Sequence, residues 1–274
     1  MSGPNPPPLW HRYVALGDSG TEGVGDEPYP DGSERGWADR LAELLAAANP
    51  RLLYANLAVR GSLTDQVHEK QLAPALALEP DLVTVVAGIN DVIRPRLDLD
   101  AALAHMDEML RDLRALDATV VTATFPDVSP INPVARLARR RLRYFNDGVR
   151  TIAADRAALL VEAEDFPVLA DRKMWCEDRL HLSPEGHRGL AAATARTLGA
   201  TVDDPHAPGA DLPGPSVSQR LRLNEELRWA RAFLLPWVHR RLTGRSSGDG
   251  RYAKRPQLAP VIPIDREGVG DRGT

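Results

Sequence analysis

Short apolar runs alternate with helix-like stretches over most of the chain, and this alternation constrains the fold more than any other feature. Residues 82–87 read Leu-Val-Thr-Val-Val-Ala, and such a nearly continuous β-branched run is typical of a strand buried on both faces. Four more strands are expected, at residues 13–16, 52–59, 119–124 and 159–161. Because helical stretches separate the strands, we predict an α/β fold whose parallel sheet is covered by helices on both faces.

The stretches between these strands have the period of amphipathic helices. Apolar residues recur at steps of four and three over residues 99–113, which places them on one face of a helix. Residues 62–65 have capping-box spacing, so a helix is expected from there to about Leu78. Ser183 precedes Pro184, and a serine cap followed by proline predicts the start of one more helix.

Length and composition indicate one main domain with an acidic surface. With 274 residues, 43% of them hydrophobic, the chain can bury a full α/β core. The chain has 34 Lys and Arg residues, of which 12 lie in residues 216–274, and 38 Asp and Glu residues, of which 6 lie there. The rest of the chain therefore has 22 basic and 32 acidic residues and is acidic. An acidic main body disfavours nucleic acid as a partner. Cys176 is the single cysteine, which excludes an intrachain disulfide and fits a reducing compartment.

The chain is expected to divide into a main domain and a C-terminal extension. Residues 1–202 form the main domain, with a Pro-rich leader over residues 1–9. Residues 203–215 are rich in Pro and Gly and indicate a linker, and residues 244–274 are expected to have little regular structure. The sequence has no secretory signal and no apolar run long enough to span a membrane, so a cytoplasmic location is expected.

Residues 216–243, between the linker and the irregular tail, are predicted to form a basic amphipathic helix. Apolar and aromatic residues recur there at helical spacing, and arginines occupy the opposite side. Such a helix can dock on its own acidic domain, pair with another subunit in a homo-oligomer, or lie on an anionic membrane. We favour docking on the main domain for two reasons. An exposed aromatic stripe promotes aggregation, and the basic C-terminal extension is opposite in charge to the acidic main domain.

Segments that follow predicted strands carry residues suited to acyl transfer. They are Ser19 in a glycine-rich turn, Gly61 and Asn90 after later strands, and Asp178 and His181 in one loop. Functional loops of an open parallel sheet lie at the carboxyl ends of its strands, so these segments are expected to meet. His181 can take the proton of Ser19, and Asp178 can orient the imidazole. The backbone N–H groups of Ser19 and Gly61 and the Asn90 amide are candidate oxyanion donors.

The sequence around these positions resembles the SGNH hydrolases, also called GDSL esterases and lipases. The four matching blocks are Gly17-Asp18-Ser19, Gly61, Gly88-Ile89-Asn90-Asp91 and Asp178-Arg179-Leu180-His181. The resemblance covers roughly residues 10–200 and implies a three-layer α/β/α sandwich with a flavodoxin-like sheet. It also implies ester hydrolysis by the serine, histidine and aspartate without a metal or cofactor. Gly20 departs from the family pattern, because many members carry a hydrophobic residue there.

The sequence leaves several functions open. The same residues suit an acyltransferase or a thioesterase, and a binding protein on this fold is the alternative outside enzymes. The complete set of catalytic groups favours a serine esterase with a small-molecule ester substrate, because a binding protein has no reason to retain it. His and Cys do not cluster at ligand spacing along the sequence, so no metal site is expected.

Residues beside the proposed catalytic groups have two interpretations each. Gly20, Arg60 and Arg94 adjoin these groups and are candidate substrate contacts, but an ion pair with a nearby acid explains either arginine equally well. His187 lies in the first turn of a predicted helix and is expected to be structural rather than the catalytic base. Asp91 is expected to form a turn or a helix cap.

Overall fold

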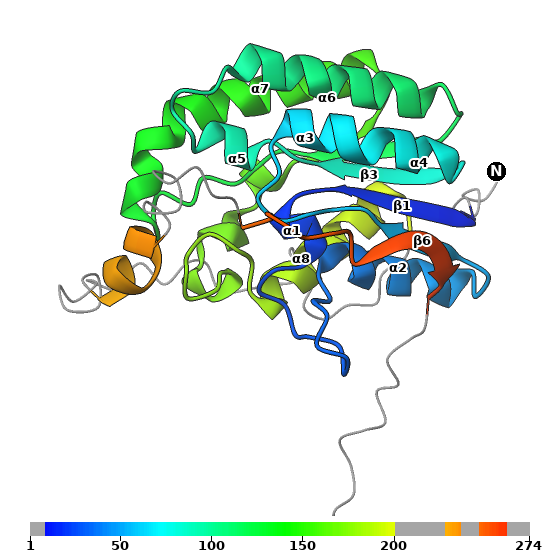
Figure 1. The fold of residues 1–274 in the computed structure, drawn as a ribbon, viewed down its shortest axis with the longest axis horizontal. Coiled ribbons are helices and arrows are strands. Elements are labelled where there is room, and N and C mark those ends of the chain that lie inside the picture. Colours follow the sequence, from blue (N-terminus) through cyan, green and yellow to red (C-terminus); the bar gives the residue numbers. More distant parts are fainter. Residues whose placement is uncertain (1–8, 201–227, 237–246, 262–274) are drawn as a thin grey trace, which may run out of the picture.

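A six-stranded sheet forms the centre of the protein in the computed structural model, which describes residues 9–200, 228–236 and 247–261. The strand order is β5-β4-β3-β1-β2-β6 (Figure 1). The strands are β1 Arg12–Gly17, β2 Leu53–Asn56, β3 Leu82–Val86, β4 Thr119–Ala123, β5 Leu159–Val161 and β6 Arg255–Pro260. The first five pair in parallel, and β6 runs antiparallel to β2. The parallel part has the flavodoxin-like order, which confirms the predicted α/β fold.

Helices cover both faces of the sheet and complete a three-layer α/β/α sandwich (Figure 1). In that view α3, α4, α6 and α7 lie on one face, and α2 and α8 lie on the other. The α-helices are α1 Ser19–Glu22, α2 Trp37–Ala48, α3 Thr64–Val67, α4 Ala73–Ala77, α5 Ile89–Val92, α6 Leu99–Arg114, α7 Arg139–Asp155 and α8 Pro184–Thr197. The π-helices are η1 His68–Leu72 and η6 Ala230–Leu234, and the 3-10 helices are η2 Pro133–Ala138, η3 Ala163–Asp165, η4 Pro167–Ala170 and η5 Arg172–Met174.

Strand β1 supplies side chains to both halves of the core. Tyr13 and Ala15 pack into the cluster that includes α2 and α8, whereas Val14 and Leu16 pack into the cluster that includes α6. All four side chains are fully buried. Because successive strand residues point to opposite faces, this short run anchors both helix layers and fixes the position of the turn that follows it.

The helix predicted from residues 62–65 to about Leu78 forms, with a change of hydrogen-bond pattern inside it. It begins at Thr64, whose backbone N–H and hydroxyl donate to Asp91 Oδ2 at 3.1 and 3.0 Å. The π-helix η1 occupies its middle, and Pro74 follows in α4. Proline has no N–H for the regular helical ladder, and the backbone pattern changes directly before it.

Residues 255–260, within the described segment 247–261, belong to the sheet. The prediction that residues 244–274 have little regular structure is wrong for residues 255–260, which form β6. Prolines in this strand hide it from a sequence pattern, but an edge strand tolerates residues that donate no hydrogen bond. Lys254 precedes β6, and its largely buried ammonium donates to Asp39 Oδ2 at 2.6 Å and to two backbone carbonyls.

The basic segment predicted over residues 216–243 is described at residues 228–236. These residues are helical, and η6 is the π-helical part. Trp229 is buried there, while Leu235 is exposed. The linker 203–215, and the leader up to residue 8, lie outside the described residues.

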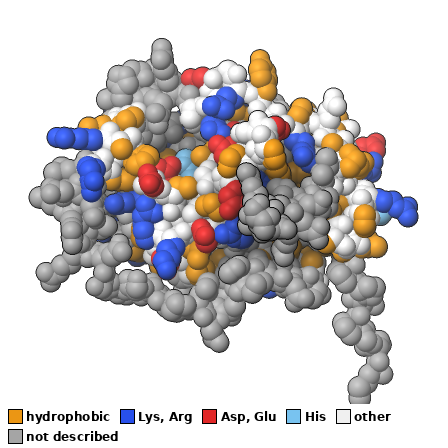
Figure 2. Space-filling view, turned by 90° about the horizontal axis from the view of Figure 1, so that it is seen from below, with side chains coloured by type: hydrophobic (Ala, Val, Ile, Leu, Met, Phe, Trp, Pro, Cys, Tyr) orange, Lys and Arg blue, Asp and Glu red, His pale blue; other side chains and the backbone are white. Residues whose placement is uncertain are grey.

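The described surface is mixed in character. On the face seen in Figure 2, acidic, basic and hydrophobic side chains are interspersed among the described residues. The large hydrophobic residues that are exposed come from different parts of the chain, for example Leu9, Leu137 and Tyr252. Within the described ranges, no helix combines the length and apolar character that crossing a bilayer requires.

Candidate active site

Close backbone packing fixes the turn that presents Ser19. Gly17 ends β1 with a φ of 153°, and a Cβ atom there would lie 2.3 Å from the carbonyl oxygen of Val86. The side-chain amide of Gln71 accepts from Gly17 N and donates to Gly17 O, at 2.9 Å each. Glycine is therefore required at this position, and Asp18 caps the short helix α1 that starts with Ser19.

Ser19, His181 and Asp178 stand in a continuous hydrogen-bonded series. His181 Nε2 lies 3.0 Å from Ser19 Oγ, and His181 Nδ1 lies 2.5 Å from Asp178 Oδ2. The second carboxylate oxygen, Asp178 Oδ1, accepts from the backbone N–H groups of Leu180 and His181, at 2.9 and 3.0 Å. Burial raises the pKa of Asp178, but its hydrogen bonds and the charge interaction with His181 outweigh burial and lower the pKa overall. The ionised carboxylate orients the imidazole toward Ser19.

Gly61 and Asn90 lie with Ser19 in the wall of one cavity. Gly61 has a φ of 77°, in the left-handed region that favours glycine. The Asn90 amide donates through Nδ2 to Asp18 Oδ2 and to the carbonyl oxygen of Ser62, both at 3.1 Å. These two bonds hold the amide group at the edge of the cavity.

The carboxylate of Asp18 titrates in an unusual range. Burial raises the pKa of Asp18 from 3.8 to about 6, although hydrogen bonds from Gly20 N and the Asn90 amide and the charge of His181 act in the opposite direction. The bond from Gly20 N measures 3.2 Å. The acceptor that holds the Asn90 amide therefore changes its charge closer to neutral pH than an ordinary aspartate does.

Two cavities with mainly apolar walls meet at His181. The first has a volume of about 220 Å³, and its polar wall contains Ser19, Gly20, Gly61 and Asn90. Its apolar wall includes Val86, Phe125, Phe166, Trp175 and Leu190. The second has a volume of about 530 Å³ and is lined in part by Leu142, Trp229, Phe233 and Pro236. Both cavities share Leu180 and His181, so the imidazole lies between two apolar spaces.

Comparison of the sequence with known families identifies the protein's class. The sequence profile of the GDSL-like Lipase/Acylhydrolase family matches residues 15–188, which is more than half of the chain. The chain belongs to this family. It is accordingly a hydrolase that acts on ester bonds. No curated protein matches its sequence.

Solved enzyme structures share the fold of this GDSL-family chain. LAE5, an alpha/beta hydrolase enzyme from the metagenome of Lake Arreo, Spain, is 22% identical with a TM-score of 0.59, and the match covers 69% of this chain and 95% of LAE5. Axe2, an acetylxylan esterase from Geobacillus stearothermophilus, is 23% identical with a TM-score of 0.57, over 70% of this chain and 95% of Axe2. Similarity at this level of identity establishes the fold.

Two parts of the C-terminal extension reach the site of this GDSL-family hydrolase, and neither position is predicted from the sequence. Trp229 is buried, and its indole N–H donates to the backbone carbonyl of Asp178 at 3.2 Å. The guanidinium carbon of Arg179 lies 4.7 Å from the centre of its ring. Ser247 contributes to the wall of the first cavity. The aromatic stripe of residues 216–243 is a sequence signal for docking, but it does not indicate which loop the ring contacts.

Gly20 is the one candidate substrate contact that lies in the wall of either cavity. Arg60 instead forms ion pairs with Glu22 and Glu34, at 2.6 and 3.3 Å. The Nε atom of Arg94 is buried and has no hydrogen-bond partner among the described residues, and burial lowers the pKa of this guanidinium. The structure thus places neither arginine where it would contact a substrate in these cavities.

His187 holds loops around the site together. Its Nδ1 accepts from Trp37 N at 3.0 Å, at the start of α2, and its Nε2 donates to the carbonyl oxygen of Val24 at 3.2 Å. Burial lowers the pKa of His187 to about 4, so the ring is neutral at physiological pH. Both ring nitrogens of His187 are engaged in these hydrogen bonds. The histidine that lies beside Ser19 is His181.

Proposed function

We propose that this protein hydrolyses a carboxylic ester of a small molecule through an acyl-enzyme on Ser19. The observation that carries the proposal is the hydrogen-bonded series of Ser19, His181 and Asp178. His181 Nε2 lies 3.0 Å from Ser19 Oγ, and His181 Nδ1 lies 2.5 Å from Asp178 Oδ2. A serine hydroxyl becomes an effective nucleophile when a neighbouring base takes its proton. The arrangement supplies that base together with a carboxylate that orients it.

In the proposed reaction, His181 Nε2 accepts the Ser19 proton while Ser19 Oγ forms a bond to the carbonyl carbon. The bond to the alkoxy oxygen then breaks, and His181 gives its proton to the departing alcohol. Water attacks the acyl-enzyme with His181 again as base, which releases the acid and restores the Ser19 hydroxyl. Asp178 remains ionised throughout and stabilises the positive charge on the imidazole.

The developing oxyanion would be bound by the backbone N–H groups of Ser19 and Gly61 and by the Asn90 amide. All three residues line the first cavity, which supports a shared role. The Asn90 amide donates to Asp18 Oδ2, and one of its N–H groups exchanges this acceptor for the oxyanion when the intermediate forms. Hydrogen-bond donors aimed at this position stabilise the transition state, because negative charge develops there.

Variants of the structurally similar Axe2 support the same assignment of roles. Those described as catalytic mutants replace one serine, one aspartate and one histidine, and the last two are three positions apart. Asp178 and His181 have the same spacing here. The proposal transfers this set of roles and not the acetylxylan substrate, because the identity is only 23%.

The two cavities indicate the character of the ester. Their walls are mainly apolar and adjoin His181 from two sides, so an apolar group can lie on each side of the scissile bond. Apolar groups bind in such cavities because removing apolar surface from water is favourable, by roughly 25 cal/mol of free energy for each Å² buried. We therefore propose esters with apolar acyl and alcohol groups as the substrate class.

A panel of p-nitrophenyl esters with acyl chains from acetyl upward tests this function. We expect kcat/KM to rise from the acetyl ester to an ester with an acyl chain of several carbons. We also expect kcat/KM on that longer ester to exceed kcat/KM on acetylated xylo-oligosaccharide. Ser19→Ala and His181→Ala are expected to lower kcat at least about 10³-fold, because each removes a group of the relay.

His187→Ala is the matched control, because it removes a second histidine that is near the site and does not contact Ser19. We expect its loss of kcat to be small beside that of His181→Ala when both proteins are assayed folded. Wild-type kcat in Ser19→Ala, or a larger loss in His187→Ala than in His181→Ala, would contradict the mechanism.

A further inference from the structure

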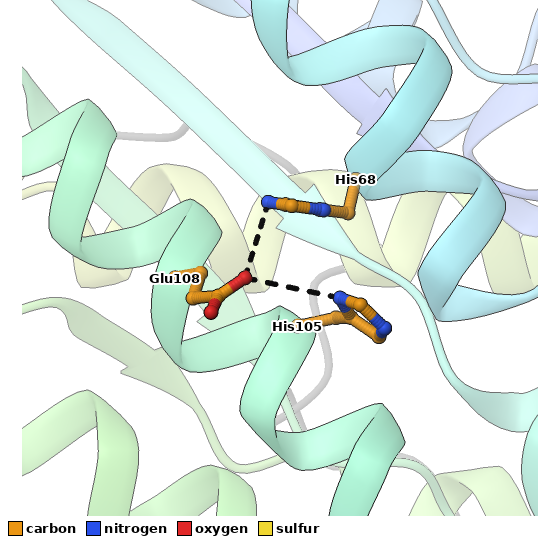
Figure 3. Close-up of side chains that lie close together, drawn as sticks. All are labelled: His68, His105 and Glu108. Atoms are coloured by element: carbon orange, nitrogen blue, oxygen red, sulfur yellow. Dashed lines mark ion pairs between the residues drawn. The ribbon is translucent and has the colours of Figure 1, made fainter.

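A cluster of metal-binding side chains lies on the helices that cover one face of the sheet, apart from both cavities. Its members are His68 in η1 and His105 and Glu108 in α6 (Figure 3). The two histidines are far apart in the sequence, so ligand spacing along the chain does not indicate the cluster. The packing of η1 against α6 brings the rings together, with centres 5.0 Å apart.

The distances in the cluster are close to those that one ion requires. His68 Nε2 lies 3.4 Å from Glu108 Oε2, and His105 Nδ1 lies 3.9 Å from the same oxygen. One ligand atom from each of the three residues can be chosen so that all three atoms lie within 4.8 Å of one another. Two ligand atoms that each lie about 2.0–2.1 Å from a tetrahedral zinc ion are about 3.3 Å apart. Small side-chain rotations would therefore bring all three atoms to bonding distance.

The chemistry of the donors also fits an ion. His105 Nδ1 is buried and has no hydrogen-bond partner among the described residues. A buried polar atom without a partner costs free energy, and a metal ion supplies the missing interaction. The side chains of His68, His105 and Glu108 are 25%, 33% and 43% exposed, so an ion can enter from solvent.

We propose that His68, His105 and Glu108 bind one divalent transition-metal ion, with Zn²⁺ as the preferred ion. Two imidazoles and one carboxylate are ligands that zinc prefers, and water completes the tetrahedron. Calcium and magnesium prefer sets of oxygen ligands and are expected to bind weakly. The proposal concerns a site outside the cavities and does not depend on the ester reaction.

The site would join η1 to α6, and η1 also contacts the turn that presents Ser19. His68 shares η1 with Gln71, whose amide holds both the N–H and the carbonyl of Gly17. An ion that ties η1 to α6 would stabilise the folded state, since the ligands do not stand together in the unfolded chain. The expected consequence is a higher Tm and not a change in the reacting groups.

Titration of the full-length, tag-free protein with ZnCl₂ tests the proposal, after removal of metal by dialysis against EDTA. Calorimetry is expected to show one ion per chain at the site. At a hundredfold excess over Kd, Tm is expected to rise by about 5–10 °C. His68→Ala and His105→Ala are each expected to weaken binding at least about tenfold and, at the same ZnCl₂ concentration, to reduce the rise in Tm by about half or more. MgCl₂ is expected to produce no comparable rise.

Glu69→Gln is the matched control for Glu108→Gln. Both remove one negative charge, but Glu69 is exposed in η1 and lies outside the cluster. We expect Glu108→Gln to weaken zinc binding and Glu69→Gln to leave it unchanged. Equal losses in the two variants would overturn the proposal, because they would show a general effect of charge.

Histidine modification of the wild-type protein keeps the test valid if a variant does not fold. Diethylpyrocarbonate modifies accessible imidazole nitrogens, and mass spectrometry locates the products. Zinc is expected to protect His68 and His105 and to leave the exposed His11 reactive. Absence of stoichiometric binding, or zinc that protects neither histidine of the cluster, would overturn the proposal.

Discussion

The indole N–H of Trp229 donates a hydrogen bond to the backbone carbonyl of Asp178 at 3.2 Å. The loop that carries the carboxylate partner of His181 is therefore bonded to a helical segment from the C-terminal extension. Arg179, the next residue of that loop, lies against the face of the same ring. The extension thus contacts the backbone that positions Asp178, and this contact has a testable effect on activity.

Trp229→Phe is expected to lower kcat/KM about threefold to tenfold while the protein stays folded. The change removes the donor to Asp178 O and keeps an aromatic ring, and one neutral hydrogen bond contributes about 1 kcal/mol. Steady-state kinetics on one p-nitrophenyl ester checks the result. Leu235→Ala is the control, because this residue lies on the same segment and is 58% exposed. Equal kinetics in all three proteins would show that the contact does not influence the loop.

Asn90→Ala is expected to lower kcat by about 10²–10³ with a smaller effect on KM, because it removes the proposed oxyanion donor, which would act mainly in the transition state. The neighbouring variant Asp91→Asn is the comparison. Asp91 accepts from the N–H and the hydroxyl of Thr64, so its substitution should lower the free energy of unfolding by about 1 kcal/mol and leave kcat nearly unchanged. A reversed pattern would contradict both assignments.

The unfolding free energies of wild type and His187→Asn are expected to converge as the pH falls. Burial lowers the pKa of His187 from 6.5 to about 4, so the unfolded chain binds a proton there before the folded chain does. This group's contribution is complete above pH 6.5 and is lost as pH falls toward 4, by up to about 3 kcal/mol. The variant lacks this loss, although at pH 7 it is less stable because the bonds of His187 are gone.

Denaturant unfolding of both proteins between pH 7 and 4 measures this difference. Asp18, with a pKa raised to about 6, contributes in the opposite direction over part of this range, since its folded state binds the proton first. Its contribution is the same in both proteins and cancels in the comparison. A constant difference between pH 7 and 4 would show that His187 does not titrate as described.

Lys254→Met is expected to lower the free energy of unfolding by about 3 kcal/mol, because it leaves the carboxylate of Asp39 buried without its cation. The side chains of Lys254 and Asp39 are 13% and 2% exposed, and their ion pair measures 2.6 Å. Arg251→Met removes a cation from an exposed position of the same segment and serves as the control. The double variant with Asp39→Asn should recover part of the loss. Equal stability of Lys254→Met and Arg251→Met would show that the ion pair between Lys254 and Asp39 does not stabilise the folded domain.

Local patterns in the sequence are sufficient where the decisive neighbours are close along the chain. Alternating faces of β1 and the four-three spacing of residues 99–113 predict elements that the structure contains. Asp178 and His181 are three residues apart, so their spacing alone predicts that the carboxylate can orient the imidazole. Ser19 and Asn90 follow strands of one parallel sheet, and such strands bring their carboxyl ends to the same edge. These features follow from backbone geometry that any sequence with the same pattern shares.

Only the tertiary structure decided which distant segments complete the molecule. Trp229 reaches Asp178, Lys254 reaches Asp39, and residues 255–260 extend the sheet although their prolines indicate a loop. His68 meets α6 because of how two helices pack. Each of these contacts depends on the sum of many burial and hydrogen-bond terms over the whole fold, which leaves no periodic signal at either partner. The sequence by itself therefore determined the five parallel strands and the order of the reacting groups, and packing determined the sixth strand and the surroundings of the site.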